Sequence, residues 1–218
     1  MRLLLTVLLL LLLPGTAAAA DLSLTLSPAA GVRYGAVQAA NGRLTDGAAP
    51  LAAQAVELRA RAYPYEGAFE TIATAQTDAA GAYAFERRFR RNVQLQVLAP
   101  AQQASSPLRR AYVFPRPRST FLALDDGRLR ITQYLRTPVG VRLTARTIFY
   151  LGPETAETAP RVAAAKPRRI GRGRFRATAT VGLPPAWRGS FRYGSCFRYS
   201  EGSGMGDPQA SCPRRYRF

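Results

Sequence analysis

The sequence predicts an all-β protein: two tandem antiparallel β-sandwiches after a cleaved signal peptide. In several segments apolar residues alternate with polar ones, which is typical of half-buried strands. Turn signals separate these segments at short intervals, as in antiparallel sandwiches. Helical periodicity is nearly absent after the first 20 residues, so we expect strands and loops in both predicted domains, residues 21–115 and 116–218.

Two segments show the alternation most clearly. Val56 and Leu58 alternate with charged residues. Val93 and Leu95 alternate with glutamines. Because successive side chains of a strand point to opposite faces, we expect these four residues in the core of the first sandwich. Turn signals lie at Asn41-Gly42, Asp46-Gly47, Tyr63-Pro64 and Asp125-Asp126-Gly127.

Residues 77–85 predict a tight turn that leads into a strand. Asp78 can accept hydrogen bonds from backbone N–H groups ahead of it, and Gly81 can adopt a positive φ. Tyr83 and Phe85 then share one face of the next strand, and we expect both in the core. This segment provides turn and core residues and has no catalytic content.

The N-terminus has the features of a secretory signal peptide. Arg2 precedes an apolar run from Leu3 to Leu13, small residues follow up to Ala20, and we expect cleavage before Asp21. The run is far shorter than the roughly 20 residues of a bilayer-spanning helix. We therefore expect a secreted or cell-envelope protein with no transmembrane segment in the mature chain.

The two halves share an outline. Val56 to Arg61 matches Val141 to Arg146, and Gly81-Ala82-Tyr83 matches Gly173-Arg174-Phe175. These matches predict a diverged tandem repeat, with extra residues in the second copy between Glu154 and Lys166. Between the copies, the segment from Ser105 to Arg118 predicts a last strand, Ala111 to Phe114, and a short linker.

Several motifs of the first half carry a family resemblance. In order, they are Tyr34-Gly35, Gly42 to Gly47, Pro50-Leu51-Ala52, Val56-Glu57-Leu58, Phe69 to Ala73 and Thr77 to Phe85. With these motifs, residues 22–98 resemble the bacterial extracellular Ig-like domains, which grade into the transthyretin-like carboxypeptidase regulatory-like group. The resemblance implies a sandwich that serves as a spacer, adhesion or accessory domain, without a shared active site. The second half is related to this pattern only through the internal repeat.

Positive charge is concentrated in the second half. The chain has 31 basic and 13 acidic residues and a net charge of +18. Residues 21–115 contain 10 Arg against 7 acids, whereas residues 116–218 contain 19 Arg and Lys166 against 6 acids. A GC-rich genome also produces many arginines and alanines, so a binding role and a purely compositional origin both stay open.

The usual catalytic patterns are missing. The chain has no His, which excludes Ser-His-Asp and Cys-His arrangements. Lys166 is not part of an SxxK pattern, and the glycine-rich segments do not lie between a strand and a helix. The acid pairs Asp125-Asp126 and Glu154 with Glu157 lie in predicted turns or loops with many arginines available. We expect no enzyme activity, no cofactor and no metal site.

Arginine alternates with aromatic residues along the second half. On strands, this pattern would place the aromatic rings in the core and the arginines on an outer face that binds phosphate or carboxylate polymers. A solvated strand face in any arginine-rich protein has the same pattern. The candidate anion-binding residues are Arg172, Arg174, Arg176, Arg192, Arg198, Arg214 and Arg215. Without a recognisable nucleic-acid module, no specific nucleic acid partner is expected.

Cys196 and Cys212 are the two cysteines. In an exported chain without His, a pair this close in sequence predicts a disulfide in preference to a zinc site. About 15 residues inside the ring correspond to a stabilisation on the order of 3 kcal/mol.

The alternation also predicts which way this disulfide points. Counted from Phe191, the following aromatic residues share its core face, and Cys196 lies on the outer face. The bond would then hold the tail, Pro213 to Phe218, over the outside of the sheet. The tail arginines would lie near Arg192 and Arg198, in a cluster relieved by a bound anion or a nearby acid.

Two functional hypotheses remain. One is a non-catalytic structural or adhesive module whose basic second domain associates with anionic cell-wall polymer. The other is a specific module for another extracellular protein, acting through loops such as Glu201 to Gln209 or through a sheet edge. Ionic strength distinguishes them, because charge-driven polymer binding weakens steeply with salt.

Overall fold

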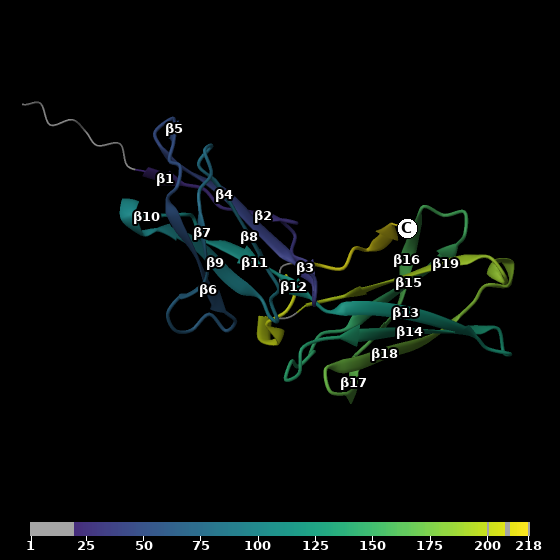
Figure 1. Ribbon diagram of the computed structural model, residues 1–218. Coiled ribbons are helices and arrows are strands. Elements are labelled where there is room, and N and C mark those ends of the chain that lie inside the picture. The colour runs from purple at the N-terminus through teal and green to yellow at the C-terminus, as the bar shows by residue number, and fades with distance from the viewer. Residues whose placement is uncertain (1–19, 200, 208–209, 218) are drawn as a thin grey trace, which may run out of the picture.

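The computed structural model describes residues 20–199, 201–207 and 210–217 (Figure 1). Strands dominate this part of the chain, and its helices are three short 3-10 turns at Pro100–Gln102, Pro185–Trp187 and Glu201–Ser203. The all-β prediction is confirmed. The predicted signal peptide, apart from Ala20, lies outside the described residues.

Strands of the first half form two antiparallel sheets. One has the order β1 (Ala20–Leu22), β4 (Gln38–Asp46), β2 (Thr25–Ser27), with β5 (Ala49–Pro50) and β8 (Ala82–Arg87) also paired to β4. The other has the order β10 (Ala104–Ser105), β9 (Val93–Ala99), β6 (Ala55–Ala62), β7 (Glu70–Gln76), with β11 (Arg109–Ala111) paired to β9. Side chains from both sheets meet in one apolar cluster. It contains all six predicted core residues, Val56, Leu58, Tyr83, Phe85, Val93 and Leu95.

Strands of the second half form two further antiparallel sheets. The first has the order β13 (Arg116–Ala123), β14 (Arg128–Arg136), β18 (Arg174–Gly182), β17 (Arg168–Gly171). The second has the order β19 (Phe191–Phe197), β15 (Thr147–Pro153), β16 (Thr158–Ala165), β20 (Arg215–Arg217). Both sheets contribute to the cluster of Leu129, Ile131, Phe149, Leu151, Ala177 and Leu183. The division of the chain into two domains at residue 115 stays a prediction.

Most of the predicted turns are present, and one is wrong. Asp78 Oδ1 accepts hydrogen bonds from the backbone N–H groups of Ala80 and Ala82, and Gly81 has a φ of +70°. Asn41-Gly42, in contrast, lies inside β4. A side chain at Gly42 would collide with the Tyr83 hydroxyl, which donates a hydrogen bond to the Ser23 carbonyl. Gly42 therefore allows a close approach within a strand.

The linker and the internal repeat also need correction. Arg116 to Arg118 begins the strand β13, and most of Glu154 to Lys166 is the strand β16. Residues 141–146 contain no strand, although they match the strand β6 in sequence. Their apolar residues Val141 and Leu143 are buried in irregular structure. The other match holds locally, because Gly81 and Gly173 are both turn residues with positive φ before a strand.

The two halves meet at a junction built around Asn92. On the side of the first half, β3 (Val32–Arg33) pairs in parallel with β12 (Val113–Phe114). The Asn92 side-chain amide donates to the Gly206 carbonyl and accepts from the Val113 N–H. Met205, which is 0% exposed, packs with Val113 in an apolar cluster shared by both halves. A loop near the C-terminus is thereby anchored in the junction.

Candidate anion-binding face

The sheet β13-β14-β18-β17 has one face against the core and one face outward. In β18, Phe175 and Ala177 are buried, and Arg174 and Arg176 are exposed. The same alternation in β14 leaves Arg136 exposed. The period of two along each strand thus gathers arginines on the outer face.

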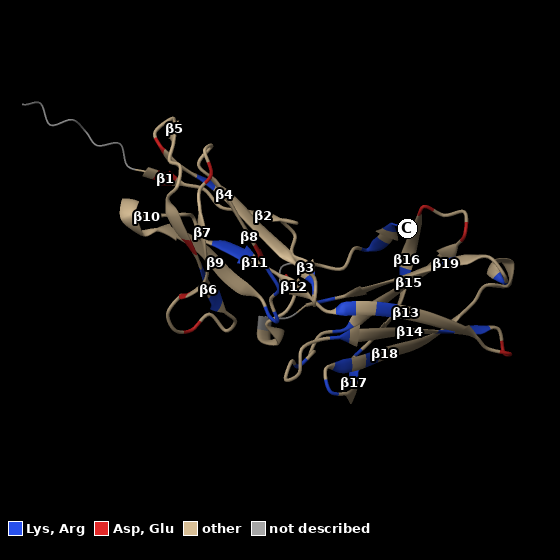
Figure 2. Ribbon diagram, in the orientation of Figure 1, with Lys and Arg blue, Asp and Glu red and all other residues tan. Residues whose placement is uncertain are grey.

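We call this outer surface the arginine face. It consists of Arg116 and Arg118 from β13, Arg130 and Arg136 from β14, Arg174 and Arg176 from β18, Arg168 from β17, and Arg172 from the turn between β17 and β18. Figure 2 shows basic segments of β13, β14 and β18 close together near the ends of these strands that lie toward the first half.

Strand register aligns these side chains in rows. In the first row, Arg136 lies between Arg116 and Arg174 on the neighbouring strands. The second row consists of Arg118, Tyr134, Arg176 and Arg168. The third consists of Thr120, Thr132 and Thr178. Directly opposite residues on one face have Cβ atoms about 4.5–5.5 Å apart, so each row forms a line of adjacent side chains.

The positive charge of this face has no acidic counterpart in the sheet. The four strands contain no Asp or Glu. In the turn between β13 and β14, Asp126 pairs with Arg128 at 2.5 Å, and this hydrogen bond lowers the pKa of the Asp126 carboxyl. Within the described ranges, no salt bridge reaches the arginine face. Because like charges directly opposite each other destabilise a sheet, an anion bound across the rows would remove a repulsion.

The arginine face is hollowed at its first two rows. A cavity of about 730 Å³ lies there, lined mainly by Arg116, Arg118, Tyr134, Arg136, Arg172 and Arg174. Guanidinium groups bind carboxylate and phosphate in a planar, bidentate geometry, which a point charge does not provide. The hollow therefore offers the guanidinium donors that an anion-binding site needs.

Only part of the predicted set belongs to this site. Arg172, Arg174 and Arg176 lie together on the arginine face. The other four candidates lie on the second sheet or its tail: Arg192 in β19, Arg198 just after β19, Arg214 before β20 and Arg215 in β20. Arg215 donates to the Thr158 hydroxyl. The gathering of the tail arginines with Arg192 and Arg198 stays a prediction.

Sequence reasoning missed Arg116, Arg118, Arg130, Arg136 and Arg168 as members of the site. The predicted linker contains Arg116 and Arg118. A usable signal was present, because residues 128–136 alternate basic or polar residues with Leu129, Ile131 and Leu135. The arginines of β14 meet those of β18 only because the two strands pair. This pairing joins residues far apart in the chain, such as Thr132 and Thr178, which are 46 residues apart.

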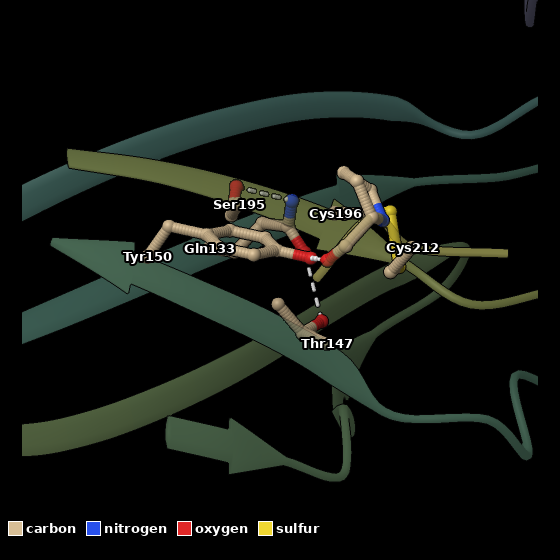
Figure 3. The surroundings of a disulfide bond; sticks show 7 residues. Gln133, Thr147, Tyr150, Ser195, Cys196 and Cys212 are labelled. Carbon is tan, nitrogen blue, oxygen red and sulfur yellow. Dashed lines mark hydrogen bonds between the residues drawn. A yellow bond between two sulfur atoms is a disulfide. The ribbon is translucent and has the colours of Figure 1, made fainter. Parts of the chain in front are cut away.

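The opposite outer face of the second half is covered by the C-terminal tail. The disulfide joins Cys196 to Cys212, as predicted, and both lie on the outer side of the sheet with Ile148 and Tyr150. The Tyr150 hydroxyl donates to the Pro213 carbonyl at 2.6 Å. We call this surface, formed by β15 and β19 with the tail over them, the tail-covered face (Figure 3).

Tyr216 completes the tail-covered face. Its ring packs on the ring of Tyr150, with centroids 5.2 Å apart. A Cβ at Gly194 would lie 2.7 Å from the Tyr216 ring, so the glycine makes room for it. Tyr150 is 0% exposed, although it points away from the main core. Burial raises the pKa of its phenol above the usual value.

A polar network connects the two sheets inside. Gln133 donates to the Ser195 hydroxyl at 2.7 Å and accepts from the Thr147 hydroxyl at 2.8 Å (Figure 3). Ser119 Oγ lies 3.0 Å from Ser195 Oγ. Gln133 and Thr147 are buried, and their side-chain amide and hydroxyl are hydrogen-bonded. This network links the two sheets, and its members Ser119 and Ser195 are half-buried.

No protein-family model matches the chain, and no curated protein matches its sequence. In the ranges that the structure describes, no helix is long and apolar enough to cross a membrane.

Proposed function

We propose that this chain is a non-catalytic, exported module of the extracellular Ig-like kind, which binds anionic polymer at the cell surface through the arginine face. It acts as a structural or adhesive unit of the cell envelope. The signal-peptide pattern at the N-terminus and the disulfide between Cys196 and Cys212 support an oxidising, extracytoplasmic location.

One observation carries the proposal: arginines stand directly opposite one another across three strands of a sheet without acids. The alignment of Arg116, Arg136 and Arg174 costs stability unless anions neutralise it. A polymer with repeated phosphate, sulfate or carboxylate groups would neutralise several arginines at once. Each guanidinium would add a charge-assisted hydrogen bond.

The test compares two triple variants of equal net charge. Arg116→Gln, Arg136→Gln and Arg174→Gln together remove the first row. Arg161→Gln, Arg198→Gln and Arg214→Gln remove three exposed arginines from the second sheet and its tail. We expect the first-row variant of the mature chain to elute from immobilised heparin at clearly lower salt than the control variant. Equal elution would show that only net charge matters, and would contradict a defined face.

A second candidate is a protein-binding module that acts through a sheet edge. β13 is the end strand of its sheet, and Phe121 and Leu122 on it are 52% and 55% exposed. Such an edge can pair with an extended segment of a partner. The loop alternative is less favoured, because Ser203 to Gly206 are buried in the junction. A partner captured from envelope extract at high salt, and lost in a Phe121→Lys variant, would support the edge over the arginine face.

A further inference from the structure

Three hollows follow one another on the arginine face. The first, about 730 Å³, and the second, about 440 Å³, share Tyr134 in their walls. The third, about 320 Å³, shares Arg176 and Thr178 with the second. The first two open on the outer surface of β14 and β18, and the third lies beside β18, where Ala165, Lys166 and Arg168 complete its wall. They form a continuous track, longer than a single anion needs.

The chemistry of this track changes along the strands. The first row carries three arginines, and the second places Tyr134 between Arg118 and Arg176. The third row carries only threonines, and the hydroxyls of Thr132 and Thr178 lie 3.3 Å apart. Alternate residues of a strand are about 7 Å apart, so the surface changes from guanidinium to aromatic ring to hydroxyl over roughly 14 Å.

We infer that the track binds an anionic polysaccharide laid along β14 and β18. The inference rests on the proposed function and names its ligand class. Acidic groups of the glycan lie on the first two rows, a sugar ring packs on Tyr134, and sugar hydroxyls exchange hydrogen bonds with the threonine row. An amphipathic tyrosine that is 36% exposed can offer a ring face to the sugar and its hydroxyl to water.

Two other polyanions fit this surface less well. A linear polyphosphate has charges for the arginines but nothing for Tyr134 or the threonines. Single-stranded nucleic acid on a sheet stacks successive bases on several aromatic side chains. The three rows contain one aromatic residue, Tyr134, and Phe121 at the wall of the second hollow has its ring packed against Phe191 and Tyr193. The combination of dense arginine, one ring and a row of hydroxyls favours a sugar polymer.

The experiment measures binding of three probes to the mature chain by calorimetry at one fixed salt concentration. The probes are a sulfated hexasaccharide, a polyphosphate of similar charge and a thymidine oligonucleotide. Tyr134→Ala removes the ring and Tyr134→Phe keeps it. Thr178→Val removes one hydroxyl, and Arg198→Gln is the control outside the face.

We expect Tyr134→Ala to weaken binding of the hexasaccharide about tenfold, which is a typical effect of losing one stacking contact. The same variant should change binding of polyphosphate less than about twofold. Tyr134→Phe should stay within about threefold of the wild type. Thr178→Val should weaken binding of the hexasaccharide by about threefold or more, and should leave binding of the other probes unchanged. Because Tyr134 is partly exposed, unchanged thermal unfolding of Tyr134→Ala would show that the fold is intact.

The possible failures are distinguishable. If the wild type binds none of the probes, both this inference and the proposed function are wrong. If the hexasaccharide and polyphosphate both bind, and Tyr134→Ala lowers the two affinities equally, the polysaccharide inference is overturned while the anion-binding function stands. If the oligonucleotide binds most tightly and depends on Tyr134, the ligand is a nucleic acid and the inference is also overturned.

Discussion

The two outer faces of the second half differ in composition: the strands β13, β14, β17 and β18 contain nine arginines, whereas β15 and β19 contain one, Arg192. The arginine face has arginines in adjacent rows and no covering segment among the described residues. The tail-covered face has Tyr150, Gly194 and a disulfide under a segment from the chain's own C-terminus. The contrast shows that alternation decides which residues point outward, and that the identity of these residues decides whether the face is covered.

The strand β15 is buried on both of its faces and illustrates this difference. Six consecutive residues, Thr147 to Gly152, are buried, so the strand is apolar or small on both of its faces. A strand of this kind needs a layer on each side. The main core supplies one layer, and the tail with Tyr216 supplies the other. β14, with Arg130, Tyr134 and Arg136 outward, needs no second layer and leaves its outer face available for a ligand.

The sharpest test of this contrast uses the same residue type on the two faces. Tyr150→Ala should lower the free energy of unfolding by about 3–5 kcal/mol, because it leaves a cavity under the tail and removes the hydrogen bond to Pro213. Tyr134→Ala should cost less than about 1 kcal/mol, because its ring is partly exposed. Urea unfolding followed by circular dichroism measures both. Similar losses would show that the two faces do not differ in packing.

Removing the disulfide tests how the tail is held. The double variant Cys196→Ser and Cys212→Ser should lose on the order of 3 kcal/mol. We expect proteolysis to cleave the tail first, while the strands of the core stay protected and heparin elution is unchanged. Mass mapping without reductant should show the linked peptides in the wild type. Two free thiols in exported protein, or loss of heparin binding in the double variant, would contradict this separation of the faces.

Local sequence signals predicted much of the fold. The turn at Asp78 and Gly81 and the core positions Tyr83 and Phe85 depend on residues close in sequence, and they are confirmed. The sequence predicts a turn at Asn41-Gly42, because the residue that Gly42 approaches in space, Tyr83, lies 41 residues away on another strand. Sequence alternation could not show such a contact.

The candidate site was predicted only in part for a similar reason. Arg174 and Arg176 lie in a dense basic segment that is visible in the sequence itself. Arg136, 38 residues before Arg174, lies on β14, which pairs with β18, and Arg116, 58 residues before Arg174, lies on β13, which pairs with β14. The orientation of Cys196, in contrast, needed only the period of two within its own strand, and it is confirmed.

A pair of glycine variants gives a smaller, equally matched comparison. Gly194→Ala should cost about 1–3 kcal/mol, because the new Cβ would lie 2.7 Å from the Tyr216 ring. Gly182→Ala, in β18 of the other sheet, has nothing within 4 Å of the new Cβ and should be neutral or slightly stabilising. Thermal unfolding compares the two. Equal melting temperatures would mean that the tail shifts to make room for the new methyl group without a loss of stability.

The smallest expected effect is the response of the tail-covered face to alkaline pH. Burial raises the pKa of the Tyr150 phenol in the folded state, above the value of about 10 for an exposed phenol. Above pH 10 the unfolded chain therefore loses this proton first, and the contribution of Tyr150 to stability falls as the pH rises toward its folded pKa. At neutral pH, Tyr150→Phe should be less stable than the wild type by about 0.5–1.5 kcal/mol, through the lost hydrogen bond to Pro213. Urea unfolding at a series of pH values should show this gap narrowing above pH 10, since the variant has no phenol at that position to deprotonate. If the two stabilities change in parallel over the whole pH range, the tail leaves Tyr150 accessible to water. The tail-covered face would then resemble the arginine face.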